Sequence, residues 1–196
     1  MIEVIVSDVI LRAPKNEEAK WLASGKDYKL GSSRVILLKE RSGSRILTIW
    51  IGPVEGDLIA LALENLAVQR PMTHDLTLRL LEAWQVKIQK VVVTDLRDNV
   101  YYASVWIIAG DQIHEVDSRP SDAIALAAQG GTPIFVTPEL FECAAVGSES
   151  QLEEIHLSAI AEGRIEADAK EMEFRSYRSL PRGEVCGLVR RGEPAA

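Results

Sequence analysis

The chain has few cysteines, and this shortage excludes several classes of small secreted protein. Its 196 residues include two, Cys143 and Cys186, which show neither metal-ligand spacing nor a disulfide framework. A chain of this length buries roughly 70% of the surface that it exposes when unfolded, so its core needs no metal or disulfide to hold it. Two isolated thiols favour a reducing compartment, and we expect the protein to be cytoplasmic.

The N-terminus lacks the features of a signal peptide or a membrane span. The segment IEVIVSDVIL has no basic lead-in, carries Glu3 and Asp8, and is too short and too β-branched to cross a membrane. We therefore expect a first β-strand there and no membrane partner.

Basic residues are also fewer than acidic residues. The chain has 22 Lys and Arg residues against 29 Asp and Glu residues, which gives a net charge of −7. An acidic protein repels a polyanion unless basic residues gather on one face or bound cations reverse the local sign. The basic residues are spread through the core sequence, so a role on nucleic acid would favour metal dependence or weak binding.

Two hairpin strands and a helix are indicated after a polar connection at Ala13–Ser33. Arg34–Glu40 and Arg45–Ile51 alternate in polarity around Ser42-Gly43-Ser44, which predicts a β-hairpin with glycine in its turn. Pro53 then marks a helix start, because proline fits the first helical turn, and a broad apolar stripe follows it.

A second helix and further strands complete the predicted core. Thr73 is expected to cap a helix whose inward face is formed by Leu76, Leu80, Leu81 and Trp84. Strands are then predicted at Lys87–Asp95, Val100–Ala109, Gln112–Val116 and Thr132–Val136, and short helices at Pro120–Ala128 and Pro138–Ala145. This order predicts an α+β fold with helices packed on a mixed, largely antiparallel sheet.

The stretch Glu115–Ala128, EVDSRPSDAIALAA, is the strongest candidate for a functional site. Its strand ends near Asp117, and Pro120 starts a helix that Gly130-Gly131 terminates. Four polar side chains thus meet at a strand-to-helix corner, where α/β proteins often bind ligands: Asp117, Arg119, Ser121 and Asp122. The structural alternative is a capped helix whose Arg and Asp side chains pair.

Two arrangements of this corner remain open from the sequence. Asp117 and Asp122 are expected to face each other across Arg119, and they form a cation site if Arg119 leaves them free. If Arg119 pairs with one or both, the side chains form a brace, and any anion is held by the helix N-terminus. Removing one member of a buried brace would cost roughly 3–5 kcal/mol.

Titratable side chains also occur at two other helix starts. Glu55 lies in the first turn of the helix from Pro53, while His74 and Asp75 lie in that of the next helix. The helix dipole alone explains acidic residues at these positions, and a His–Asp pair there is often a cap. As hard oxygen ligands, Glu55, Asp117 and Asp122 are candidates for binding Mg²⁺ or Mn²⁺. The candidate catalytic residues are Asp117, Asp122, Arg119, His74 and Asp75, and the candidate substrate-binding residues are Arg119, Ser121 and Arg70.

Four segments in register resemble the bifunctional nuclease (BFN) domain family. They are ILTIWIGPVEGDLIALALENL, RPMTHDLTLRLLEAW, EVDSRPSDAIALA and TPIFV, and the resemblance runs from about Met1 to Val146. It implies an α+β domain, self-association and, by analogy with plant members, cleavage of DNA and RNA. The sequence departs from the family pattern at Gly56, where alanine is usual, at Gln85, where glycine is usual, and in a longer Ala13–Ser33 connection.

Two functions of different class follow. The first is a nuclease that hydrolyses phosphodiester bonds of DNA or RNA with a divalent metal. The second is a non-enzymatic module that binds a phosphate or nucleotide at the helix after Pro120, or that only assembles. A homo-oligomer is expected in either case, because the helices offer more apolar face than one modest sheet covers.

The C-terminal part is expected to be an extension, which gives a domain at 1–146 and a second region at 147–196. Ser150–Phe174 is acidic and carries apolar residues at helical spacing, which predicts one amphipathic helix. Arg175–Arg191 then holds five arginines against one acid, Glu184, a composition typical of a loosely packed tail or of a segment that tracks phosphates.

Overall fold

The protein, a computed structural model, is described at residues 1–14, 34–66, 68–147 and 172–176. Within these ranges nine strands form one sheet in the order β6-β5-β4-β7-β1-β2-β3-β8, with β9 also pairing with β1. The strands are β1 (Ile2–Pro14), β2 (Arg34–Glu40), β3 (Ile46–Ile51), β4 (Val86–Arg97), β5 (Val100–Ala109), β6 (Gln112–Ser118), β7 (Ile134–Val136), β8 (Ala145–Val146) and β9 (Met172–Ser176). All neighbours are antiparallel except β4 and β7, which confirms the predicted mixed, largely antiparallel α+β fold.

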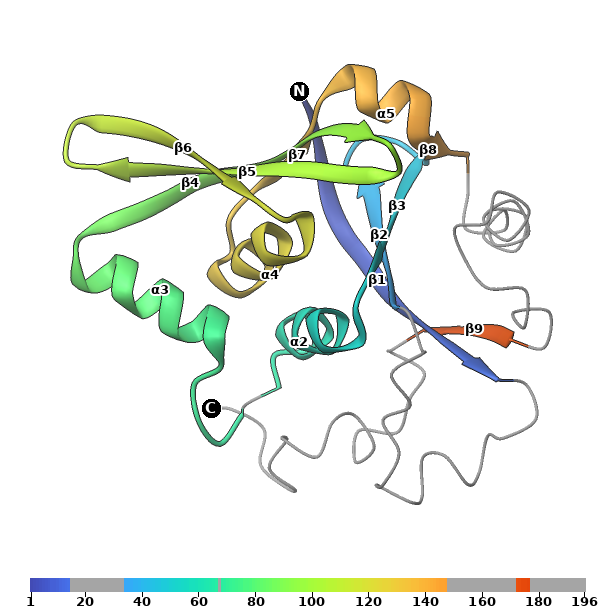
Figure 1. Ribbon diagram of the computed structural model, residues 1–196, viewed down its shortest axis with the longest axis horizontal. Coiled ribbons are helices and arrows are strands. Elements are labelled where there is room, and N and C mark those ends of the chain that lie inside the picture. The colour runs from blue at the N-terminus through green and yellow to red at the C-terminus, as the bar shows by residue number, and fades with distance from the viewer. Residues whose placement is uncertain (15–33, 67, 148–171, 177–196) are drawn as a thin grey trace.

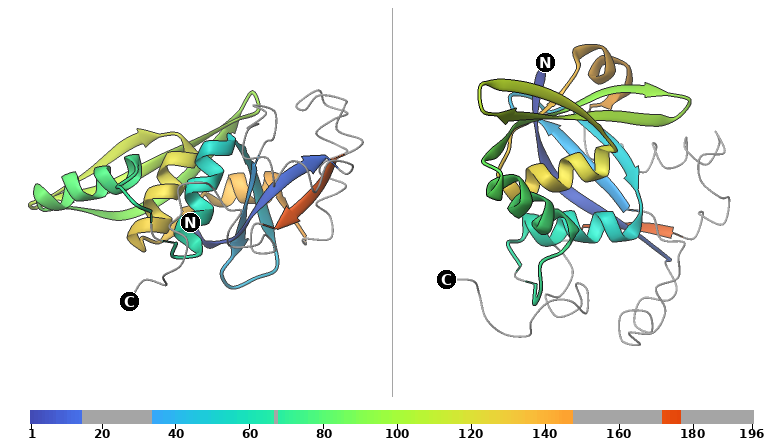
Figure 2. Two further views of the ribbon diagram at one scale, coloured as in Figure 1. Left: turned by 90° about the horizontal axis from the view of Figure 1, so that it is seen from below. Right: turned by 60° about the vertical axis from the view of Figure 1, so that its left-hand side comes forward.

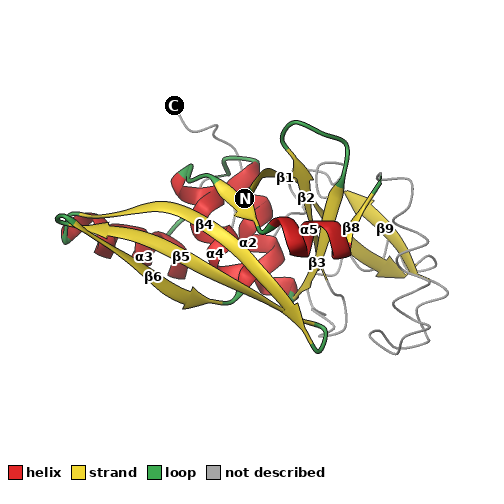
Figure 3. Cartoon of the chain, turned by 90° about the horizontal axis from the view of Figure 1, so that it is seen from above, coloured by secondary structure: helices red, strands yellow, loops and turns green. Residues whose placement is uncertain are grey.

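Helices cover both faces of this sheet. They are α2 (Pro53–Leu63), α3 (Thr73–Ala83), α4 (Pro120–Gly130) and α5 (Pro138–Ala144). Figure 1 shows α2, α3 and α4 together on one side of β4–β6 and α5 on the other, and Figure 3 shows α5 in front of the strands from above. In the described part of the chain, none of the helices has the length and apolar character needed to span a membrane.

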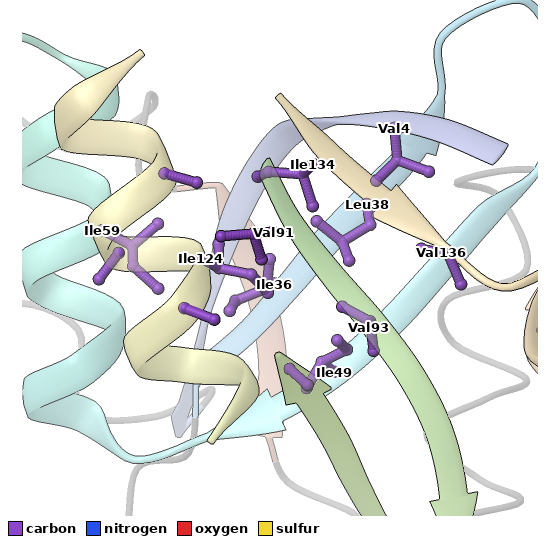
Figure 4. Packing of buried hydrophobic residues seen from close by; sticks show 14 of the residues in the cluster. Val4, Ile36, Leu38, Ile49, Ile59, Val91, Val93, Ile124, Ile134 and Val136 are labelled. Atoms are coloured by element: carbon purple, nitrogen blue, oxygen red, sulfur yellow. The ribbon is translucent and has the colours of Figure 1, made fainter. Parts of the chain in front are cut away.

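Alanine and β-branched residues allow α4 to lie deep in the core. Ala123, Ile124 and Ala127 are almost fully buried, and small side chains let the helix approach both α2 and the sheet. Figure 4 shows Ile124 of α4 pointing toward Val91 of β4 and toward the strands behind it. As predicted, α4 starts at Pro120, and Gly131 ends it in the left-handed region at φ 64°.

The strand β7 joins two separate antiparallel ladders. Its three residues pair in parallel with β4, where Val91 lies opposite Ile134, and antiparallel with β1, where Ile2 lies opposite Val136. One ladder is β4–β5–β6 and the other is β1–β2–β3, so the continuity of the sheet depends on this short strand.

A buried ion pair lies between the hairpin and α2. Arg34 Nε donates to Asp57 Oδ1 at 2.9 Å, and both residues are only 4% exposed. A Cβ placed on Gly56 would overlap the Cβ and Cγ of Arg34. Glycine is therefore required here by the close approach of the Arg34 stem, which explains this departure from the family pattern.

The predicted orientation of α3 was wrong. Leu76, Leu80 and Trp84 were expected to face inward, but they are 54%, 53% and 81% exposed. The helix instead lies against α4 through His74 and through Leu78, whose side chain is near Gly130. It also begins at Thr73 rather than after it, and Asp75 Oδ2 closes its end by accepting a hydrogen bond from the Met72 amide at 2.7 Å.

Several boundaries also differ from the sequence-based expectations. The strand β6 continues beyond Val116 to Ser118, so Asp117 lies inside it. Met172–Ser176 forms β9, so the predicted amphipathic helix does not extend to Phe174. The rest of that helix, the Arg-rich tail beyond Ser176 and most of the Ala13–Ser33 connection lie outside the described residues.

Candidate functional site

The candidate site is the β6–α4 corner, from Ser118 to Asp122. Arg119 is extended at φ −67° and ψ 144°, and Pro120 is the first residue of α4. Extended backbone is what the residue before a proline favours, and proline is pre-organised for the first helical turn. Within the described part of the chain no side chain caps this helix end, so the first turn has unpaired backbone N–H groups beside Arg119.

Arg119 pairs with carboxylates from two helices. Its Nε lies 2.7 Å from Asp122 Oδ2 and its Nη2 lies 3.1 Å from Asp122 Oδ1, while Nη1 lies 3.4 Å from Glu55 Oε1. The two bonds to Asp122 form the bidentate geometry that Arg favours with a carboxylate. Hydrogen bonding to Arg119 holds the pKa of Asp122 below its usual range, and the same contact raises the pKa of Arg119.

The guanidinium nevertheless faces solvent. The Arg119 side chain is 66% exposed, against 34% for Asp122 and 24% for Glu55. The structure thus has the braced arrangement, with Glu55 as a second partner, but not the buried brace expected from the sequence. The guanidinium is fixed by two carboxylates, and its exposed side is accessible to a ligand.

His74 approaches the same carboxylate from the interior. Its Nε2 lies 3.4 Å from Asp122 Oδ1, at the long limit of a hydrogen bond, and its side chain is 10% exposed. Its Nδ1 is buried and has no hydrogen-bond partner among the described residues. Asp122 therefore links a solvent-facing cation to a buried imidazole.

Asp117 lies on the other face of the sheet. It pairs with Ser104 of β5, whose neighbours Ala103 and Val105 belong to the core beneath the helices. Because side chains alternate along a strand, Ser104 and Asp117 point away from α4. The structure consequently brings Arg119, Asp122, Glu55 and His74 together and leaves Asp117, which is exposed, apart from them.

The remaining candidates occupy structural or peripheral positions. Asp75 accepts hydrogen bonds from the Met72 amide and from Gln129 Nε2, which ties α3 to the end of α4. Ser121 is only 6% exposed, so it is a buried residue of the first turn of α4. Arg70 is exposed in the connection between α2 and α3.

The carboxylates do not fit a cation as they stand. Both oxygens of Asp122 and one of Glu55 accept from Arg119, so a positive group already occupies the place between them. Across the described ranges, no three His, Cys, Asp or Glu side chains converge in a way that could hold a metal ion. A cation would have to displace the guanidinium.

A pocket lies beside His74, between α2, α3 and α4. Its volume is about 280 Å³. The right-hand view of Figure 2 shows these three helices next to one another. It is lined by Leu58, Leu61, Ala62, Asn65, Leu66, Val68, Met72, His74, Asp75, Ala128 and Gln129. Sequence reasoning missed the pocket, because its residues come from three separate segments.

Comparison with known proteins agrees with the resemblance carried by the sequence segments. Residues 36–149 match the bifunctional nuclease domain. Two proteins of Mycobacterium tuberculosis, the uncharacterized proteins MT1877 and Rv1829 from two strains, are each 34% identical over 132 residues, which cover 67% of this chain and 79% of each relative. The chain belongs to the bifunctional nuclease domain family.

Proposed function

We propose that the protein is a nuclease that hydrolyses phosphodiester bonds of DNA or RNA at the β6–α4 corner. Family membership supports the class of reaction. The observation that supports this location of the site is the exposed guanidinium of Arg119 at the N-terminus of α4. A guanidinium beside helix N–H groups is suited to a phosphate, because both supply hydrogen-bond donors and positive potential.

Each residue of the corner has a distinct part in this proposal. Arg119 and the amides of the first turn bind the phosphate and stabilise the negative charge that develops on its oxygens. Asp122 orients Arg119 and His74 and is a poor proton acceptor, since its pKa is lowered. His74 is the proton-transfer group, because a neutral imidazole has one ring nitrogen that donates and one that accepts a proton.

Metal dependence, with Mg²⁺ or Mn²⁺, remains part of the proposal. Asp122 and Glu55 are oxygen ligands of the right kind, but Arg119 occupies them, so no step is assigned to a metal here. Loss of cleavage on adding EDTA, with recovery on adding Mn²⁺, would show that a cation is needed. Cleavage that persists in EDTA would show that no chelatable cation is needed.

The decisive experiment is a cleavage assay on plasmid DNA and on RNA with protein freed of host nucleases. Arg119→Met should lower kcat/KM by about 10²-fold or more, the usual effect of losing a transition-state hydrogen-bond donor. The matched control is Arg41→Met, because Arg41 is also an exposed arginine, 64% accessible, paired with the carboxylate of Glu3. Equal activity of the two variants would contradict the assignment of the corner, and a parent protein that cleaves neither substrate would contradict the nuclease.

The second candidate is a phosphate- or nucleotide-binding module that breaks no bond. The burial of His74 favours it, because a general base must reach the reacting water. In that case nucleotides bind at Arg119, and purified protein leaves plasmid and RNA intact with every divalent metal.

We also propose that the protein is a cytoplasmic homo-oligomer. The exposed stripe of Leu76, Leu80 and Trp84 lies along one face of α3 and supports self-association, since large apolar patches commonly mark interfaces. Light scattering at micromolar concentration should give a multiple of the 21.6 kDa chain mass. A monomer mass would contradict the proposal, and Trp84→Glu should lower the mass if α3 forms the contact.

A further inference from the structure

The pocket beside His74 has the size of one flat ring system. An apolar cavity of about 150 Å³ accommodates benzene, so a pocket of about 280 Å³ has room for a one- or two-ring heterocycle. Folded protein segments and long chains need more space than this. The pocket is therefore suited to a small, compact group rather than to a peptide.

Its lining suits an uncharged heterocycle. Most of the wall is apolar, and its polar members are two amides, Asn65 and Gln129, the carboxylate of Asp75 and the imidazole of His74. Among the described residues that line it there is no Lys or Arg, so this part of the wall has no cationic side chain of the kind that attracts a phosphate. Apolar surfaces that contact ring faces, with a few donors and acceptors at the edge, are how proteins hold an extruded base.

The pocket adjoins the phosphate-binding corner through one side chain. His74 lines the pocket, and its Nε2 lies 3.4 Å from Asp122, which is the bidentate partner of Arg119. The His74 Nδ1 atom is buried without a hydrogen-bond partner in the part of the chain that the structure describes. The link between the two places is the His74 ring itself, which contacts Asp122 and forms part of the pocket wall.

We propose that this pocket binds the base of the nucleotide whose phosphate is held by Arg119. The site thereby has two parts, a cationic corner for the backbone and a neutral pocket for the base. This inference rests on the proposed nucleic-acid substrate, but it requires binding alone and not cleavage. It makes the pocket the place where the protein distinguishes one base from another.

Calorimetric titration tests the inference without any cleavage step. The ligands are the 5′-monophosphates of adenosine, guanosine, cytidine and uridine, with ribose 5-phosphate as the matched ligand that lacks a base. At least one nucleotide should bind about tenfold or more tightly than ribose 5-phosphate, which corresponds to about 1.4 kcal/mol. Equal affinities, or no measurable binding by any of the four nucleotides, would overturn the inference.

Two variants locate the effect. Ala128→Leu and Ala62→Leu each add a side chain to the pocket wall and leave Arg119 in place. A variant whose melting temperature is close to that of the parent should bind the nucleotide no more tightly than ribose 5-phosphate. Its affinity for ribose 5-phosphate should equal that of the parent. A folded variant that retains the full advantage would overturn the pocket as the site. Arg119→Met should weaken both ligands. Base-dependent binding without cleavage would refute the nuclease alone.

Discussion

Two arginine–aspartate pairs in this fold should respond very differently when the arginine is replaced by methionine. Methionine keeps much of the apolar stem and removes the charge, so the comparison isolates the ion pair. Arg34 and Asp57 are buried, and breaking a buried ion pair by removing one partner should cost about 3–5 kcal/mol. Arg119 is 66% exposed, so loss of its pair with Asp122 should cost about 0–1 kcal/mol.

These free energies convert into melting temperatures. For a protein of about this size, 1 kcal/mol shifts the midpoint by roughly 2–4 °C. Arg34→Met should then melt roughly 6–20 °C below the parent, and Arg119→Met at most about 4 °C below it. Thermal melts followed by circular dichroism at pH 7 measure both, with Arg41→Met as the exposed control.

These melting temperatures show whether Arg119 stabilises the fold or binds a ligand. A small loss of stability with a large loss of activity is the pattern of a ligand-binding side chain. A fall in midpoint for Arg119→Met as large as that for Arg34→Met would refute the reasoning, because it would mean that the corner is a structural brace despite its exposure.

Three further predictions concern stability. Gly56→Ala should destabilise the protein by roughly 1–3 kcal/mol, although alanine is the better helix former, because its Cβ would overlap Arg34; a midpoint at or above the parent's would contradict this. Because the pKa of Asp122 is lowered in the folded protein, its ionised carboxylate adds to the free energy of unfolding. This stabilisation is present above the unfolded pKa of about 3.9 and is lost as the pH falls through the folded pKa. The urea midpoint of Asp122→Asn should therefore change less with pH below about pH 4 than the midpoint of the parent does. The same pH dependence in both proteins would count against the pairing of Asp122 with Arg119. Removal of everything after Ser176, which keeps β9 and its pairing with β1, should leave a cooperative melt near that of the parent, and a large drop would show that the removed residues support the core.

Local sequence signals predicted most of the fold. Proline at the first position gave the starts of α2, α4 and α5, and each was confirmed. The strands predicted at Lys87–Asp95 and Val100–Ala109 form a hairpin, and Asp98 and Asn99 at its turn adopt left-handed conformations at φ 49° and 62°. These features depend on neighbouring residues, which is why the sequence contains them.

The parts that failed depend on residues far apart in the chain. Periodicity showed that α3 has an apolar stripe, but whether another layer covers that stripe is a property of the whole fold. The strand β6 is two residues longer than expected, and the alternation of side chains then placed Asp117 away from Asp122. Glu55 reaches Arg119 from a helix that precedes it by 64 residues, and no local pattern encodes that contact.

The short strand β7 also sets an order of assembly. The ladder β4–β5–β6 and the hairpin β2–β3 close over short loops, which costs little chain entropy and is fast. The pair of Ile2 with Val136 joins residues from the two ends of the described core, so forming it closes a very long loop. The three residues of β7 must also pair with β4 and β1 at the same time. We expect the two halves to form early and to be joined late, so that Ile134→Val, which removes one buried methylene, accelerates unfolding and barely slows refolding. A matching slowdown of refolding would place β7 in the nucleus instead.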